Sequence, residues 1–420
     1  MQLIPDFQQF KAPQTALYRH DSRPSGSRGK VSLLVWNLST NDGAIRALLL
    51  SEALKRLDFQ VEIVGFRFGD SLYSAIPDSI PICAIAGTQY PQFFRSIAQL
   101  LPQIQGDILY AVKPQPGSFG VALLKRWLSR SRKPLILDID DWELSWHGGD
   151  DFRYDWRARR VLRDLLKSQG ALRRPDHPLY LQWMERLIDR ADDVTTHTSF
   201  LQQRFGGVSV PNGKDVDLFD PQPYDPEACR AKYGLLDYRV LMFPGAPRPY
   251  KGLEDILTAL DLLNQPDLRL AIVGGNPYDD YDEQLKRQWG RWLIQLPRQS
   301  ADRMPELIAA AHAIVIPQRD TAATRAQFPL KITDGMAMAK PILSTRVGDI
   351  PHILGDTGYL VDANSPEQLA AQINSIFANP AEAIDRGQRA RQRCIEHYSL
   401  DAMSRQIAPV LENCLRLRCR

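Results

Sequence analysis

The stretch from Ala313 to Thr345 combines an apolar run, a polar loop and a helical pattern in an order that favours anion binding. The short apolar run Ala313–Pro317 predicts a buried strand of a parallel sheet. After the loop, Pro329 suits the first turn of a helix, because its missing N–H group would have no partner there. A helix that begins close behind a strand presents free backbone N–H groups and its positive dipole end to a phosphate or another anion. The alternative is an ordinary strand, loop and helix that bind nothing.

Acidic residues cluster at the end of another predicted strand, Leu135–Ile139. This strand runs into the sequence Asp-Ile-Asp-Asp-Trp-Glu, residues 138–143. Acids at the carboxyl end of a parallel strand lie where ligands bind in doubly wound folds. A carboxylate there can accept a proton from a substrate hydroxyl group or orient the substrate, and we favour Asp141, followed by Asp138. The alternative is a helix N-cap beside a buried, structural aspartate.

Composition and charge describe an ordinary globular protein. The chain has 420 residues, of which 44% are hydrophobic and 24% charged, and its net charge is +3. The length predicts two domains of about 200 residues each, and so small a charge does not predict a nucleic-acid partner. The five scattered cysteines form no Cys-x-x-Cys pair, which argues against structural zinc and disulfides and favours a reducing cytosol. We find neither a signal peptide nor a long apolar span, so we expect a cytoplasmic protein, with peripheral attachment to the inner face of the membrane left open.

The predicted elements form two α/β domains. In the first, the strand Val31–Trp36, a loop ending at Gly43, the helix Ala44–Leu57 and the strand Val61–Phe66 make a right-handed parallel unit. A proline-rich linker precedes the second domain, whose first strand is Val240–Phe243. We therefore expect a flexible segment (1–30), a first domain (31–220), a second domain (221–400) and a C-terminal helix (401–420).

Two basic stretches of the first domain also carry aromatic residues. Residues 123–133 hold five basic side chains and Trp127, and residues 153–174 hold eight basic side chains against two acids, with Tyr154 and Trp156 among them. Basic helices with aromatic side chains can lie on anionic membrane surfaces. A charged face in contact with water explains the same composition, so both interpretations stay open.

The stretch described first resembles the donor-binding signature of retaining glycosyltransferases of the GT-B fold, family 4. That signature has a Glu, seven residues, a second Glu, then Ala-Met-Ala and Gly-Lys-Pro. Here Asp334-Gly335-Met336-Ala337 and Ala339-Lys340-Pro341 stand at the second part, preceded by the variant Pro329-Leu330-Lys331. The first Glu is absent, because Ala326 occupies its position. Val347–Pro351 resembles the Val-Gly-Gly-Ile-Pro of the family.

Two further stretches carry the same resemblance. Residues 208–219 resemble the interdomain pattern Pro-Asn-Gly-Val-Asp-x-x-x-Phe. The loop Pro244–Gly252 resembles the Gly-Arg…Lys-Gly motif, whose Arg and Lys would here be Arg248 and Lys251. In the family these two cations clamp the donor diphosphate. They stabilise the negative charge that grows on the leaving group, and they can replace a metal in that role.

The resemblance implies two Rossmann-like domains that face each other across a cleft, with the final helix crossing back to the first domain. It implies transfer of a hexose from a nucleotide diphosphate sugar to a glycan or lipid-linked glycan with retention, without a metal or other cofactor. The only Asp-x-Asp of the second domain, residues 280–282, is expected to lie solvated in a polar loop. The donor-binding residues would be Gly43 at the diphosphate, Gly274 near the base, Gln327, Phe328, Pro329 and Leu330 beside sugar and phosphate, Lys331 at a phosphate and Asp334 at the ribose.

Other functions remain open at this point. The missing first Glu also fits a catalytically degenerate GT-B protein that binds a nucleotide sugar without turning it over. A nucleotide-sugar epimerase or a phosphorylase can use the same fold, but a phosphorylase needs a pyridoxal-binding lysine site, for which the sequence shows no motif.

Overall fold

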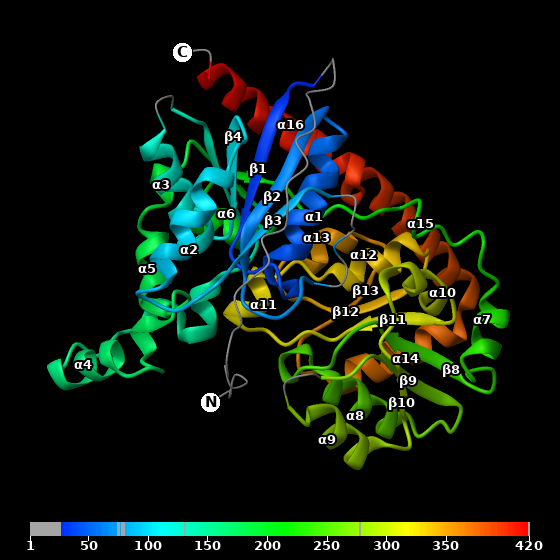
Figure 1. The fold of residues 1–420 in the computed structure, drawn as a ribbon. Coiled ribbons are helices and arrows are strands. Elements are labelled where there is room, and N and C mark those ends of the chain that lie inside the picture. Colours follow the sequence, from blue (N-terminus) through cyan, green and yellow to red (C-terminus); the bar gives the residue numbers. More distant parts are fainter. Residues whose placement is uncertain (1–26, 74–75, 77–79, 130–131, 277–278, 419–420) are drawn as a thin grey trace. The chain divides into compact units, whose positions relative to one another are not determined.

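The computed structural model describes residues 27–73, 76, 80–129, 132–276 and 279–418. The chain divides into two compact units: the first ends at Pro211 and resumes at Met403, and the second is Asn212–Ala402. Figure 1 labels the helices and strands of both units. The expected flexible segment lies outside the described residues up to residue 26, and its last residues, Gly29 and Lys30, belong to the first strand.

The described part of the first unit contains one parallel sheet of seven strands in the order β3-β2-β1-β4-β5-β6-β7. The strands are β1 (Gly29–Val35), β2 (Phe59–Arg67), β3 (Ile82–Ala86), β4 (Ile108–Val112), β5 (Leu135–Ile139), β6 (Asp193–Thr196) and β7 (Val208–Ser209). The helices are α1 (Asn41–Lys55), α2 (Phe93–Leu100), α3 (Val121–Leu128), α4 (Ala158–Leu166), α5 (Pro178–Glu185), α6 (Ser199–Phe205) and the greater part of α16 (Leu400–Arg418). The central strands β4 and β5 are mostly apolar because helices cover both faces of a parallel sheet.

The last helix belongs mainly to the first unit. From Met403 onward, Met403, Ile407, Val410 and Leu411 are buried in one cluster with the strand residue Val31. Ser404 Oγ also donates a hydrogen bond of 3.1 Å to the carbonyl oxygen of Ala53 in α1. The end of the chain is therefore a structural part of the first sheet's core.

The second unit, where the structure describes it, contains a parallel sheet of six strands in the order β10-β9-β8-β11-β12-β13. The strands are β8 (Arg239–Phe243), β9 (Leu268–Val273), β10 (Leu293–Leu296), β11 (Ala313–Ile316), β12 (Ile342–Thr345) and β13 (Tyr359–Val361). The helices are α7 (Pro226–Lys232), α8 (Leu253–Leu263), α9 (Tyr281–Trp289), α10 (Met304–Ala309), α11 (Ala322–Ala326), α12 (Leu330–Ala337), α13 (Ile350–Leu354), α14 (Pro366–Ala378) and α15 (Pro380–Tyr398).

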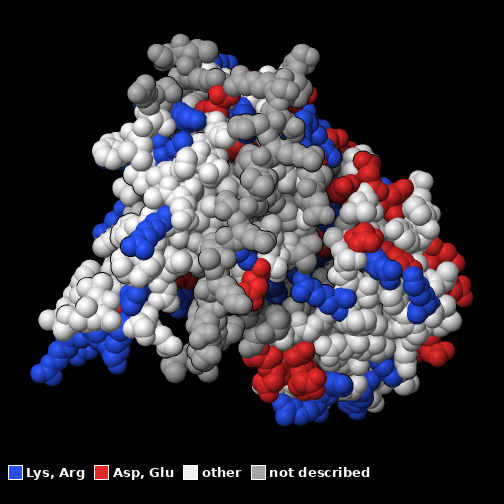
Figure 2. Space-filling view, viewed as in Figure 1, with Lys and Arg blue, Asp and Glu red and all other residues white. Residues whose placement is uncertain are grey.

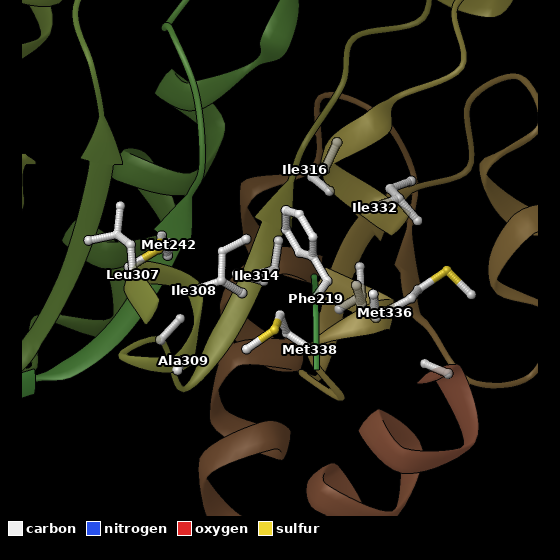
Figure 3. Close-up of a cluster of buried hydrophobic side chains, with 14 of the residues drawn as sticks. Phe219, Met242, Leu307, Ile308, Ala309, Ile314, Ile316, Ile332, Met336 and Met338 are labelled. Atoms are coloured by element: carbon white, nitrogen blue, oxygen red, sulfur yellow. The ribbon is translucent and has the colours of Figure 1, made fainter. Parts of the chain in front are cut away.

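Packing in the core of the second unit explains why this unit begins before the predicted linker. Phe219, which closes the Pro-Asn-Gly stretch, is buried in a cluster with Ile314 of β11 and with Ile332 and Met336 of α12. Figure 3 shows its ring between strand β11 and helix α12. The chain therefore enters the second unit at Asn212, ahead of the expected boundary at residue 221.

Both sheets reverse their strand order at one place. In the first sheet the reversal lies between β1 and β4, and in the second it lies between β8 and β11. Ligands of doubly wound folds bind beyond the carboxyl ends of the strands at such a switch point. The strand order thus marks one candidate position in each unit.

Candidate functional site

The loop after β8 carries the two cations that the sequence singled out. Gly252 ends this loop with a φ of 68°, and a Cβ atom there would lie 2.1 Å from the carbonyl oxygen of Pro317. Only glycine fits so close an approach in this conformation. It turns the chain into α8 and leaves Arg248 and Lys251 half-buried at the switch point of the second sheet.

Arg248 is oriented by a loop that follows β9. Its Nη1 donates a hydrogen bond of 2.6 Å to Oδ1 of Asn276. The backbone N–H of Asn276 donates in turn to Oδ2 of Asp282, at 3.2 Å. Gly274, with a φ of 87°, turns the chain between β9 and Asn276. The sequence Asp280-Tyr281-Asp282 is therefore not a solvated loop as predicted: it starts α9, and Asp282 braces the partner of Arg248.

Lys251 meets the loop that connects β11 to α12. Its Nζ donates a hydrogen bond of 3.1 Å to Oε1 of Gln327. The loop is held by a capping box between Thr321 and Thr324 and by Gln318, whose Nε2 donates to the carbonyl oxygen of Thr324 at 3.0 Å. Lys251 and Gln327, both predicted as site residues, thus contact each other from two different loops, and the loop of Gln327 is braced.

Lys331 approaches the same place from the first turn of α12. Its side chain crosses Gly245, where a Cβ atom would lie 2.2 Å from Lys331 Cε, and its Nζ is 5.5 Å from the ring centre of Phe243. Burial lowers the pKa of the Lys331 ammonium, and the negative charge of Asp334 opposes that shift. An anion placed beside this ammonium would offset the cost of its desolvation.

Asp334 forms an ion pair that the sequence did not predict. Its Oδ1 is bound by Nζ of Lys214, which also lies 3.3 Å from the ring centre of Phe219. The backbone of Lys214 is fixed between Tyr398 and Leu400 by hydrogen bonds of 2.7 and 3.0 Å. The signal in the sequence that could have pointed to this pair was the position of Lys214 in the Pro-Asn-Gly stretch, where the family pattern has Val.

Phe328 and Pro329, expected beside the donor, are buried. The ring of Phe328 lies 5.9 Å from that of Tyr398 and belongs to the core cluster beneath α12, so its role is packing. Leu330 is partly buried against the same cluster. Because phenylalanine is apolar, packing in the core is more favourable for Phe328 than the predicted contact with a polar ligand.

The rest of the signature serves the packing of α12. A Cβ atom on Gly335 would come within 2.7 Å of Ile342 Cδ1, so glycine lets α12 lie close to β11 and β12. Lys340 Nζ donates to the carbonyl oxygens of Ala309 and Ala311 at 2.7 and 2.8 Å and so caps α10. Burial, aided by Arg230, lowers the pKa of Lys340 to about 8.

In the first unit, Asp138 is buried and fully engaged. Its carboxylate accepts two hydrogen bonds of 2.8 Å from Arg46 and one of 2.7 Å from Thr195 Oγ1. Tyr110 OH is 2.8 Å from the same Thr195 oxygen, and burial raises the pKa of that phenol. Asp138 has no exposed surface. We therefore correct its assignment from substrate binding to structural support beneath the carboxyl end of β5.

Asp141 lies at the surface of this end of the sheet. Its Oδ1 accepts the backbone N–H of Trp142 at 2.8 Å, and its Oδ2 accepts Trp146 Nε1 at 3.1 Å. Nearby, Lys113 follows β4 in a left-handed conformation, and its Nζ binds Glu143. The sequence analysis did not identify Lys113. Its position directly after a buried strand was the signal that could have pointed to it.

Gly43 is part of the first turn of α1 rather than of the preceding loop. A Cβ atom on it would lie 3.5 Å from Val35 and 3.9 Å from Val112, the last residues of β1 and β4. Its φ of 79° still requires glycine. Gly43 therefore lies at the switch point of the first sheet, as a ligand-binding glycine would.

Among the described residues, no group of three or more His, Cys, Asp or Glu side chains is arranged to hold a metal ion. No helix in that part of the chain is long and apolar enough to cross a membrane. The described cysteines, Cys83, Cys229, Cys394 and Cys414, are buried free thiols.

Part of the second unit is similar to a known protein family. Residues 238–379 match the model of glycosyl transferases group 1. A GDP-mannose-dependent alpha-(1-6)-phosphatidylinositol monomannoside mannosyltransferase of Mycolicibacterium smegmatis is 26% identical over 54% of this chain and 64% of its own length. An alpha-maltose-1-phosphate synthase of the same organism is 29% identical over 45% of this chain and 52% of its own length. The chain thus spans about half to two thirds of these relatives.

Solved structures match the fold over nearly the whole chain. HepE of Anabaena, in complex with UDP-glucose, has a TM-score of 0.70 and 19% identity, and the match covers 92% of this chain and all of that one. Sucrose-phosphate synthase of Thermosynechococcus elongatus has a TM-score of 0.68 and 16% identity, covering 93% of this chain and all of that one. The predicted α/β class with two Rossmann-like units is confirmed: the chain has the GT-B glycosyltransferase fold, and residues 238–379 match the group 1 glycosyltransferase model.

Proposed function

We propose that this protein transfers a hexose from a nucleotide diphosphate sugar to a hydroxyl group of an acceptor, with retention of the anomeric configuration. One observation carries the proposal. Arg248 and Lys251, from the loop after β8, and Lys331, from the first turn of α12, lie at the switch point of the second sheet.

The chemistry of the donor explains this cluster. As the glycosidic bond breaks, negative charge grows on the leaving nucleotide diphosphate, and fixed cations stabilise that charge in the transition state. Arg248 can give the diphosphate two parallel hydrogen bonds. In the donor complex, the diphosphate replaces Asn276 and Gln327 as the hydrogen-bond partners of Arg248 and Lys251. The first turn of α12 adds backbone N–H groups, and no metal or other cofactor is part of the proposal.

The remaining donor contacts follow the family resemblance. Gly274 lies near the base, Asp334 binds the ribose, and Gln327, Pro329 and Leu330 border the sugar and phosphate. Gly43 contributes a backbone approach to the diphosphate. Retention follows a front-face route in which an oxygen of the leaving phosphate takes the proton of the acceptor hydroxyl.

The acceptor in this proposal is a glycan or a lipid-linked glycan, oriented by Asp141. The mannosyltransferase relative is named for its action on phosphatidylinositol monomannoside, which supports a lipid-linked acceptor. We propose that the enzyme works in the cytoplasm, attached peripherally to the inner, anionic face of the membrane, and that it has no nucleic-acid partner.

A donor screen tests the function. The full chain is incubated with UDP-, GDP- and ADP-linked hexoses, and release of the nucleoside diphosphate is followed by chromatography. We expect one donor to be consumed, slowly with water and faster with a glycan or lipid-linked acceptor. NMR of the product then reports the anomeric configuration. Consumption of none of these donors, or an inverted product, would contradict the proposal.

A degenerate, binding-only protein is the second candidate. It is favoured by Ala326, which is fully buried where the signature has its first Glu, and by the ion pair that engages Asp334. This candidate predicts that calorimetry detects nucleotide-sugar binding while the donor screen detects no release. The two measurements together separate it from the enzyme.

A further inference from the structure

Helix α4 turns its apolar side away from the protein. Leu162, Leu165 and Leu166 lie three and four residues apart on one face, and each is between 50% and 70% exposed. The residue that the protein buries is Asp164 on the polar side, which accepts a hydrogen bond of 2.9 Å from Tyr154 OH. An amphipathic helix normally packs in the opposite sense, with its apolar face inward.

The exposed leucines continue into a larger apolar surface. Leu165 lines a hollow of about 430 Å³ together with Phe94 and Trp183, which are exposed as well. Trp183 and Trp156 share a second, adjoining hollow. We call this continuous surface, made of Phe94, Trp156, Leu162, Leu165, Leu166 and Trp183, the α4 face. A contiguous exposed apolar patch marks an interaction site rather than ordinary surface.

The polar flank of α4 is strongly basic. Residues 153–174 carry eight basic side chains and two acids, and both acids are already paired: Asp155 with Arg157 and Arg160, Asp164 with Arg160 and Arg163. A surplus of positive charge therefore borders the α4 face. Figure 2 shows Lys and Arg side chains gathered along the lower edge of α4, beside uncharged surface.

Basic side chains of the other stretch are paired within the first unit, although Trp127 and Leu128 beside them are exposed. Arg126 and Arg132 both bind Asp192, at 3.0 and 2.6 Å, and Lys125 donates to the carbonyl oxygen of Leu101 at 2.8 Å. Residues 130–131 of that stretch lie outside the described residues. The contrast singles out α4 as the better candidate for an external partner.

We propose that the α4 face docks the first unit on an anionic phospholipid membrane, with its leucines in the acyl boundary and its arginines among the headgroups. An apolar face bordered by positive charge complements such a surface, and tryptophan favours the membrane interface. A second copy of the chain fits less well, because a two-fold contact would bring two basic flanks together. This inference rests on the peripheral membrane attachment in the proposed function, and it identifies the α4 face as the surface that makes the attachment.

Vesicle flotation of the full chain tests the docking. We expect binding to vesicles of phosphatidylcholine mixed with phosphatidylglycerol, loss of binding at high salt, and little binding to phosphatidylcholine alone. Leu162→Ser with Leu166→Ser should lower the vesicle partition coefficient about a hundredfold. Arg159→Glu with Lys167→Glu should lower it about tenfold or more.

Matched controls come from exposed positions of the second unit. Leu236→Ser with Leu262→Ser removes equally exposed leucines, and Lys286→Glu with Arg303→Glu makes the same change in charge. Neither pair should alter flotation. Quenching of the unmodified protein's tryptophan emission by brominated anionic lipid gives a readout that needs no variant.

Several results would overturn the docking proposal. They are an absence of vesicle binding, equal binding to neutral vesicles, full binding by the leucine variant, or a dimer that the leucine variant converts to monomer without any vesicle binding. Donor release by the α4 variants, measured without vesicles, separates the two proposals. Failed docking with intact donor release removes only this inference, and docking without donor release removes only the transferase proposal.

Discussion

The two sheets share one strand order, but the charged side chains at the carboxyl ends of their strands have opposite surroundings. In the first, the carboxylate at the end of β5 is buried against Arg46, so its charge is balanced inside the protein. In the second, Arg248 and Lys251 are half-buried and hydrogen-bond to the neutral amides of Asn276 and Gln327. The same topology thus holds a buried, paired carboxylate in one unit and two half-buried cations in the other.

This difference predicts which charges are structural and which bind a ligand. A buried ion pair costs stability when one partner is removed, because the other charge stays buried without compensation. Arg248 and Lys251 are only half-buried, so an incoming anion can reach them, whereas Asp138 is fully enclosed. We therefore expect variants at these two places to fail in different assays.

The largest effect is expected at the cationic site. Arg248→Ala and Lys251→Ala should each lower the turnover of donor about a hundredfold, on the scale of one lost transition-state contact. The double variant should lose more than either single variant, with an unchanged melting temperature. Steady-state kinetics of donor release measures this, and Lys286→Ala with Arg303→Ala is the control for general charge. Unchanged turnover and donor affinity in the double variant would remove the basis of the proposed function.

The next largest effect is expected for Asp138 in the first unit, where a substitution should change the free energy of unfolding and not ligand binding. Asp138→Ala leaves Arg46 buried without its partner and should cost about 3–5 kcal/mol of unfolding free energy. Replacing both, with Arg46→Met and Asp138→Leu, should restore much of that loss. Denaturant unfolding measures the change, while nucleotide affinity should stay the same. A stable Asp138→Ala protein that has lost acceptor transfer would show instead that Asp138 serves the substrate.

A smaller effect is expected at the ion pair beneath α12. Asp334→Asn should weaken nucleotide binding about tenfold, since the ribose would lose a charged acceptor. Lys214→Met should weaken it less, because Lys214 orients Asp334 without touching the ligand. Calorimetry checks both, and Lys232→Met, which removes the exposed pair with Glu306, is the matched control. Equal affinity in all these variants would make the Lys214–Asp334 pair structural only.

The smallest effect concerns the backbone of the signature. Ala339 has a φ of 53°, a left-handed conformation, where the family pattern has glycine. Ala339→Gly should therefore raise the unfolding free energy by about 0.5–1 kcal/mol. Ala337→Gly, inside α12 and buried, should lower it by about 1 kcal/mol or more. Thermal unfolding of both variants checks the contrast, and a loss of stability in Ala339→Gly would show that the alanine side chain has a packing role.

Buried strands could be predicted closely because continuous apolar runs leave few alternatives. Leu135–Ile139 has the predicted bounds, and the strand predicted as Val240–Phe243 begins one residue earlier, at Arg239. Polar stretches misled the prediction. The loop expected around Asp280 begins α9, and the polar loop after β11 contains α11. Local composition does not show which polar groups a neighbouring loop will satisfy.

The sequence by itself determined the fold class, the two sheets and the cationic loop, because apolar periodicity, glycine turns and the positions of Arg248 and Lys251 are local properties of the chain. Only the tertiary structure decided that Phe328 packs in the core, that Asp138 is neutralised by Arg46 and that Lys214 binds Asp334. The physical reason is sequence separation. Each of these roles depends on a partner many residues away, and only folding determines which distant residues become neighbours.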